Sequence, residues 1–127
     1  LTPPAPNQQF IAIAAGTSHS LGLKANGAII AWGDNTYGQL NVPSPNSGFI
    51  AVAAGSNFSV GLRSSGVIET WGDSSNGAIS VPSPNSGFTG ISAGLFHILG
   101  RKADGSVIAW GKLSAKIGGK PMLLPVK

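Results

Sequence analysis

Apolar residues along the chain are grouped in short runs, and each run ends at a glycine, a proline or a polar turn. Larger and smaller residues alternate in Phe49–Ala54, and β-branched and aromatic residues are frequent in Ser59–Arg63 and Val67–Gly72, which favours strands. A brief fourth strand is predicted near Ala78–Val81, where proline limits its length. Pairs such as Asn26-Gly27 predict tight hairpin turns. No segment keeps a 3.6-residue apolar period free of glycine and proline, so no helix is predicted.

This pattern occurs three times along the chain. Trp32, Trp71 and Trp110 recur at intervals of 39 residues, and several phenylalanines and glycines keep the same interval. The segment VPSPNSGF is identical at Val42–Phe49 and Val81–Phe88, and the first ten residues align with the same stretch. Internal repetition at such a period indicates one array rather than several domains. The predicted units are 1–39, 40–78 and 79–117, followed by a C-terminal tail at 118–127.

Four short antiparallel strands at this period are typical of propeller blades, so we predict an all-β fold of three four-stranded antiparallel β-propeller blades. The segment Ala14–Leu40 (AAGTSHSLGLKANGAIIAWGDNTYGQL) resembles the repeat of the regulator of chromosome condensation family. The shared pattern is Ala-Gly, His-Ser-Leu, an Asn-Gly turn and Trp-Gly-Asp-Asn followed by Gly-Gln-Leu. The 39-residue spacing looks more like the bacterial branch, which includes the β-lactamase inhibitory protein. The resemblance implies a propeller that engages a protein partner through loops on one ring face.

The second and third copies depart from this pattern. Phe58 stands where the first copy has His19, and Arg101 occupies a position that is leucine in the other copies. After Trp110 the chain reads WGKLSAKIGGKP and loses both the Gly-Asp-Asn and the Gly-Gln-Leu signals. The third blade is therefore predicted to be an edge blade or to have a different partner surface.

Three blades do not close a ring, because propellers have typically four to eight. The two flanks would each expose the apolar face that packs one blade on the next. The chain is then a fragment of a longer propeller, a capped open array, or a homo-oligomer in which two copies give a six-bladed ring or more copies give a larger one. We favour the homo-oligomer, because closed symmetric assemblies commonly bury such surfaces. Met122–Leu124 is predicted to be either an extra edge strand or a frayed tail.

The composition offers few groups for chemistry. The chain is 42% hydrophobic and 9% charged and contains no cysteine, which disfavours disorder and excludes disulfides and cysteine-based zinc sites. His19 and His97 hold one repeat position on different blades and cannot converge as ligands. Asp34 and Asp73 follow Trp-Gly and are expected to organise turns through backbone amides. No catalytic motif occurs, so we predict no enzyme activity, no cofactor and no metal site.

The loops between strands one and two and after strand three should emerge on one face of the ring. These loops differ between copies, whereas the PSPNSG segments and hairpin turns on the opposite face are nearly invariant. Binding commonly resides in loops on a rigid scaffold, and aromatic residues suit protein interfaces. Drift in unconstrained loops is the alternative explanation. The predicted binding residues are Asn35, Tyr37, Asn57, Phe58, Asn76, Phe96 and His97.

Our preferred function is a non-catalytic protein–protein interaction or inhibitor-like binding module. One alternative is a lectin-like binder that stacks sugars on the repeated tryptophans, although blade packing is the simpler role for them. The eukaryotic branch of the family implies another alternative, a fragment of a guanine-nucleotide-exchange propeller.

The net charge of +4 belongs to one end of the chain. Six of the eight basic residues lie in the last 27 positions, and the first 100 carry two basic and three acidic residues. A basic propeller face is therefore not expected, and we predict neither nucleic acid nor membrane as a partner. Bacterial chains with such tandem repeats resemble secreted or cell-surface proteins, which favours that location.

Overall fold

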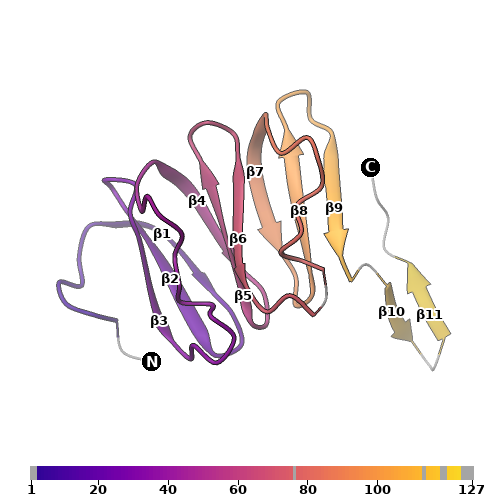
Figure 1. The fold of residues 1–127 in the computed structure, drawn as a ribbon, viewed down its shortest axis with the longest axis horizontal. Coiled ribbons are helices and arrows are strands. Elements are labelled where there is room, and N and C mark those ends of the chain that lie inside the picture. Colours follow the sequence, from indigo (N-terminus) through magenta and orange to yellow (C-terminus); the bar gives the residue numbers. More distant parts are fainter. Residues whose placement is uncertain (1–2, 76, 113, 118–119, 124–127) are drawn as a thin grey trace.

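A computed structural model of the chain describes residues 3–75, 77–112, 114–117 and 120–123. Nine strands form three antiparallel sheets of three strands each, which stand in a row in chain order (Figure 1). The described part of the chain holds no helix, so none is long and apolar enough to cross a membrane. The first sheet contains β1 (Phe10–Ala15), β2 (His19–Lys24) and β3 (Ile29–Gly33); the second contains β4 (Phe49–Ala54), β5 (Phe58–Arg63) and β6 (Ile68–Gly72); the third contains β7 (Phe88–Ala93), β8 (His97–Lys102) and β9 (Val107–Gly111).

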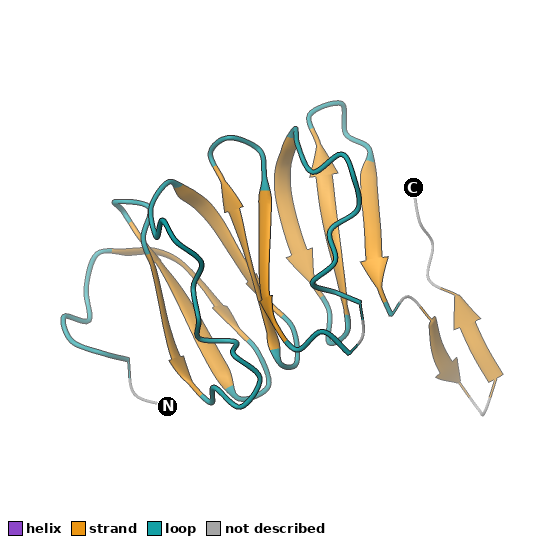
Figure 2. Ribbon diagram, viewed as in Figure 1, coloured by secondary structure: helices purple, strands orange, loops and turns teal. Residues whose placement is uncertain are grey.

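The predicted all-β blades are confirmed, and the predicted bounds of the first three strands of a unit agree with the structure to within one residue. The predicted fourth strand at Ala78–Val81 is wrong, because these residues lie in loop (Figure 2). A turn occupies most of this segment, in which the Ser80 N–H donates to the Gly77 carbonyl over 3.2 Å. Pro82 follows and has no N–H to extend a ladder. Each sheet therefore has three strands rather than four.

A bulge shapes the first strand of every blade. In the first blade, Phe10 pairs with Lys24 and Ala12 pairs with Leu23, so that Ile11 is left without a partner in the register. The same shift occurs between Phe49 and Ala51 in the second blade and at the corresponding place in the third. The bulge turns the unpaired residue away from the neighbouring blade.

The hydrophobic core lies between the blades. One side of the first blade packs against the second through Leu21, Leu23 and Ile29, which meet Phe49 and Trp71. The second blade repeats this arrangement toward the third, where Val60 and Leu62 belong to one cluster with Trp110. Each tryptophan at these interfaces also donates its Nε1–H to a carbonyl of the preceding linker, at Gln39 (2.9 Å) and Ala78 (2.8 Å). The tryptophans of the second and third blades therefore serve blade packing.

A basic residue at the end of the second strand of each blade fixes the linker that precedes that blade. Lys24, Arg63 and Lys102 lie over the rings of Phe10, Phe49 and Phe88, with 4.0–4.2 Å between the cation and the ring centroid. Each cation also donates to two linker carbonyls two residues apart, for example those of Pro45 and Ser47. Pro6–Phe10 therefore sit on the first blade as the corresponding parts of the VPSPNSGF segments sit on the other two.

The C-terminal residues form a separate hairpin of β10 (Ser114–Ile117) and β11 (Lys120–Leu123). Ser114 pairs with Leu123 and Ile117 with Lys120. Met122 and Leu123 pair with β10, and the predicted edge strand on a blade at Met122–Leu124 stays a prediction. Leu124 lies outside the described residues.

Candidate functional site

The loops that precede the second strand of each blade and those that follow the third strand lie at the same end of every blade, so that together they line one side of the row. We call this end the loop face. The Asp34 N–H donates to the Ser18 carbonyl over 2.8 Å, and the Asp73 N–H donates to the Asn57 carbonyl over 3.0 Å. In the third blade, Lys112 makes the same bond to the Phe96 carbonyl. The predicted grouping of the two sets of loops is therefore confirmed.

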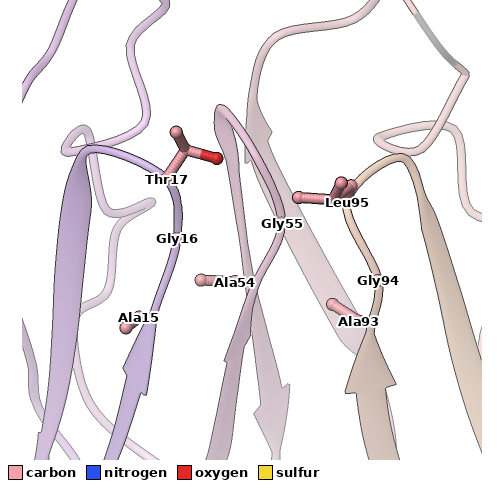
Figure 3. A pocket seen from close by; sticks show the side chains of 8 residues that line it. All are labelled: Ala15, Gly16, Thr17, Ala54, Gly55, Ala93, Gly94 and Leu95. Carbon is pink, nitrogen blue, oxygen red and sulfur yellow. The ribbon is translucent and has the colours of Figure 1, made fainter.

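A shallow pocket of about 430 Å³ crosses the loop face (Figure 3). All three blades line it with the residues at the end of their first strand and the start of the following loop. Small residues dominate the lining, and Thr17 and Leu95 are the largest side chains. Its lining residues are Ala15, Gly16, Thr17, Ala54, Gly55, Ala93, Gly94 and Leu95.

The glycine of each Ala-Gly pair leaves room for an aromatic ring that folds beneath the loop. A Cβ atom on Gly16 would lie 2.3 Å from Cε1 of His19, and one on Gly55 would lie 2.0 Å from Cε2 of Phe58. Real Cβ contacts are never so short, so any side chain at these two positions would displace the ring. The Ala-Gly signal in the sequence thus reflects a requirement of packing.

Backbone hydrogen bonds tie the three pocket loops together. The Thr17 N–H donates to the Ser56 carbonyl over 3.3 Å, and the Ser56 N–H donates to the Leu95 carbonyl over 2.9 Å. Each loop therefore donates to the loop of the next blade in chain order. This arrangement holds the pocket as one surface across three blades.

His19 is buried beneath the pocket and links the first two blades. Its Nε2 lies 3.0 Å from Oγ of Ser59, whose hydroxyl donates to the Gln39 carbonyl over 2.8 Å. Because that hydroxyl proton is used, His19 donates from Nε2. Burial lowers the pKa of His19 below its ordinary value of 6.5, while the Phe58 backbone and the charge of Asp34 act in the opposite direction. The imidazole of His19 therefore has a structural role at the boundary between the two blades.

Phe58 and Ile98 occupy the positions of His19 and Ser59 at the next interface. Phe58 is 1% exposed and packs in the core between the second and third blades with Ile98. The prediction that Phe58 binds a partner is therefore wrong, because its ring is inaccessible from the loop face. A polar pair at the first interface is replaced by an apolar pair at the second.

The other predicted binding residues fall into three groups. Tyr37 and Phe96 are exposed on the loop face, by 51% and 38% of their surface. Asn35 is used within its own loop, where its Oδ1 accepts from the Leu40 N–H over 2.9 Å, and Asn57 is half-buried. His97 is half-buried on the outer side of the third blade, where no blade follows in the structure. Asn76 lies outside the described residues.

The loop face offers few groups for catalysis or metal binding. Asp34 accepts from the Thr36 hydroxyl over 2.7 Å, and Asp73 accepts from the Ser75 hydroxyl over 3.0 Å, so both carboxylates organise their own turns as predicted. Within the part of the chain that the structure describes, no group of three or more histidine, cysteine, aspartate or glutamate residues could hold a metal ion. The arrangement is suited to contact with another surface.

Two features, one on the loop face and one on the opposite face, were not predicted from the sequence. Leu95 is 61% exposed in the pocket, although its loop was treated only as part of a variable set. The Asn of each PSPNSG segment was read as part of a loop, whereas Asn46 and Asn85 bond to the preceding blade. The signal in the sequence was that this asparagine occurs at the same place in both copies of an identical segment.

Antiparallel sheets that pack face to face in a row, with their loops gathered along one side, are typical of β-propeller blades, although each sheet here has three strands rather than the usual four. Residues 10–39 and 49–78 match the family model described as the regulator of chromosome condensation (RCC1) repeat. These two segments are similar to RCC1-type propeller repeats, and the third sheet has the same strand pattern. No curated protein sequence matches the chain.

Solved structures of larger proteins share the fold. The ectodomain of the Physcomitrella patens receptor kinase CR4 is 27% identical with a TM-score of 0.68, and the match covers 85% of this chain and 32% of that one. Prp20p from Saccharomyces cerevisiae is 19% identical with a TM-score of 0.73, with 98% and 40% covered. The ectodomain of the Arabidopsis thaliana receptor kinase ACR4 is 24% identical with a TM-score of 0.66, with 90% and 44% covered. The chain thus spans less than half the length of each.

Proposed function

We propose that the chain is a non-catalytic β-propeller module whose loop face binds a protein partner. The observation that carries the proposal is the exposure of Tyr37, Leu95 and Phe96 on a surface that is otherwise held by bonds between blades. Exposed aromatic residues on a rigid frame are the usual anchors of protein interfaces. Lys112 lies 5.6 Å from the centroid of the Phe96 ring and adds a cation beside this anchor.

The similar structures support a protein partner as the class of ligand. Prp20p was solved with a description of its binding to Gsp1p and histones, and the yeast protein was also solved bound to Kap60. The finer proposal is an inhibitor-like module of the bacterial branch, similar to the β-lactamase inhibitory protein and secreted or held at the cell surface. It is supported by the 39-residue repeat length.

The proposal includes a homo-oligomer in which further copies continue the row of blades. Both flanks of the row expose residues whose counterparts at the interior interfaces are buried. Further copies of the chain would cover these residues in a closed symmetric assembly. Binding at the loop face and assembly at the flanks are separate parts of the proposal and can be tested separately.

The lectin-like and exchange-factor alternatives have less support. Trp71 and Trp110 are buried and use their Nε1–H groups on linker carbonyls, so their rings are not free to stack on a sugar. No acidic group gathers on the loop face beyond Asp34 and Asp73, which are used in turns. A glycan array probed with the purified chain tests the first alternative, and we expect no binding.

The test of the proposed function identifies the partner and then measures its affinity. A photo-crosslinking phenylalanine analogue at position 37 in the source cells should capture the partner for identification by mass spectrometry. Calorimetry with the purified partner should then show at least about tenfold weaker binding for Tyr37→Ala and Phe96→Ala, the size usual for interface anchors. Ser65→Ala, on the opposite end of the second blade, is the matched control and should bind normally. Unchanged affinity in both loop variants would overturn the proposal.

A further inference from the structure

Both interior interfaces use the same set of connections between blades. The side-chain amide of Asn46 accepts from the Ile29 N–H over 2.7 Å and donates to the Ile29 carbonyl over 2.8 Å. Asn85 makes the same two bonds to Ile68, over 2.9 and 2.8 Å. An asparagine that follows the linker prolines therefore clamps the first residue of the last strand in the preceding blade.

Two backbone bonds and one side-chain pair complete the set. The Phe49 N–H donates to the hairpin carbonyl of Gly27, and the Phe88 N–H donates to that of Gly66, each over 3.1 Å. On the loop face, the loops donate in series toward the next blade, as described above. The pair beneath them is His19 with Ser59 at the first interface and Phe58 with Ile98 at the second.

The outer side of the first blade carries the residues that, at the interior interfaces, the following blade supplies. Asn7 aligns with Asn46 and Asn85, and Lys24 holds its linker by the Pro6 and Gln8 carbonyls as the other basic residues hold theirs. Ser20 aligns with Ser59 and is half-buried instead of fully buried. A hollow of about 620 Å³ opens here, lined partly by Pro6, Phe10 and Ile30.

The outer side of the third blade carries the complementary half. Val107 aligns with Ile29 and Ile68, and among the described residues no asparagine side chain bonds to its backbone as Asn46 and Asn85 bond to those two. His97 aligns with His19, and it is half-buried here. Leu99 is also half-buried, whereas its counterparts Leu21 and Val60 are fully buried.

Apolar exposure distinguishes the interface positions on the first blade from their neighbours. Ile13 is 77% exposed, although its counterparts Val52 and Ile91 pack into the two interior cores. Ile11 is 63% exposed, and its counterpart Ile50 is still 53% exposed in the interior blade because it is the bulged residue. A blade packed against this flank would therefore cover Ile13 and leave Ile11 in solvent.

We propose that the outer side of the third blade binds the outer side of the first blade in a second copy of this chain, with Asn7 clamping Val107 and Ser20 accepting from His97. The inference rests on the homo-oligomer in the proposed function and specifies its contact. The pair of His97 with Ser20 has the same two residue types as the His19–Ser59 pair of the first interface. It differs from the apolar pair of Phe58 and Ile98 at the second interface. Arg101 replaces a leucine on this flank, and its guanidinium bonds to Thr89 of its own blade, over 3.3–3.4 Å. The contact is head-to-tail, so it builds a ring or an open row.

Single variants test the contact through the mass of the purified full chain in light scattering. Ile13→Lys and Leu99→Lys each place a cation in the contact and should weaken assembly at least about a hundredfold, since burying an unpaired charge is strongly unfavourable. Ile11→Lys is the matched control with the same charge change, and it should assemble like the unsubstituted chain. Asn7→Ala should weaken assembly by about tenfold through the loss of two hydrogen bonds.

Mixing the two lysine variants distinguishes this contact from any other. The Ile13→Lys chain keeps an intact third blade and the Leu99→Lys chain keeps an intact first blade, so the mixture should form a dimer of one copy of each. This result also shows that both variants fold. If either variant alone assembles like the unsubstituted chain, or the mixture stays monomeric, the head-to-tail contact is wrong while loop-face binding is unaffected. A monomeric unsubstituted chain would overturn the homo-oligomer as well.

Discussion

The imidazole of His19 donates across the boundary between the first and second blades to Oγ of Ser59, over 3.0 Å. At the corresponding places of the next boundary, the chain has Phe58 and Ile98, which pack without any polar bond. Two residues have therefore changed together between one interface and the next. A mixed pair would lose the bond between Nε2 and Oγ and leave a buried polar group with fewer partners.

This relationship predicts non-additive effects of substitution. Ser59→Ile alone leaves the His19 donor without a partner and should lower the free energy of unfolding by about 1–3 kcal/mol. The double variant His19→Phe with Ser59→Ile recreates the pair of the second interface and should cost at least about 1 kcal/mol less than the sum of the two single variants. Urea unfolding of all four chains measures this coupling. Additive costs would show that the two positions act independently.

The buried histidine also predicts a dependence of stability on pH. Burial lowers the pKa of His19 in the folded state, so the unfolded chain binds the proton more readily below pH 6.5. The stabilising effect of neutral His19 is therefore complete above that pH and is lost as the pH falls toward the folded-state pKa. The unfolding midpoint in urea should fall from pH 7.5 to pH 5, and the drop should be smaller for His19→Phe with Ser59→Ile. Equal drops in the two chains would contradict the assignment.

The asparagine clamp predicts a stability loss at an apparently ordinary loop residue. Asn85→Ala removes both bonds to the Ile68 backbone and should lower the free energy of unfolding by about 1–3 kcal/mol, because the freed groups are partly buried. Asn26→Ala is the matched control, since Asn26 makes one exposed bond to the Ala28 N–H, and it should cost about 0.5 kcal/mol. Thermal unfolding of both variants gives the comparison, and equal losses would rule out the clamp.

The Ala-Gly pair predicts steric intolerance under the pocket. Gly55→Ala would place a Cβ atom 2.0 Å from the Phe58 ring and should destabilise the chain by about 1–3 kcal/mol. Gly90→Ala is the control, because the nearest atoms there belong to the far end of the flexible Arg101 side chain. It should change the unfolding temperature little. A tolerated alanine at position 55 would mean that the ring can move.

The sequence predicted the strands well because each side chain that defines them acts locally. Alternation in Phe49–Ala54 and the glycine turns depend on neighbours a few residues away, and the 39-residue period made one blade a template for the others. The fourth strand was predicted from the apolar residues of Ala78–Val81. These residues fill the boundary between two blades as a turn, which is a tertiary contact that local propensity does not report.

The candidate site was predicted at the level of loops and less well at the level of residues. Successive antiparallel strands run in opposite directions, so alternate loops were correctly predicted to lie on one face, and Tyr37 and Phe96 are exposed there. Phe58 was chosen as an exposed aromatic although it takes the place of the buried His19, because sequence cannot show that a ring folds beneath Gly55. The basic residues over the phenylalanines were also missed, although their interval was visible in the repeat.

The mass of the unsubstituted chain in solution most directly tests the proposal that the two flanks are complementary halves of one interface. Multi-angle light scattering over a range of concentrations should give an integer multiple, two or more, of the 12.7 kDa chain mass. A mass of 12.7 kDa at every concentration would contradict the claim.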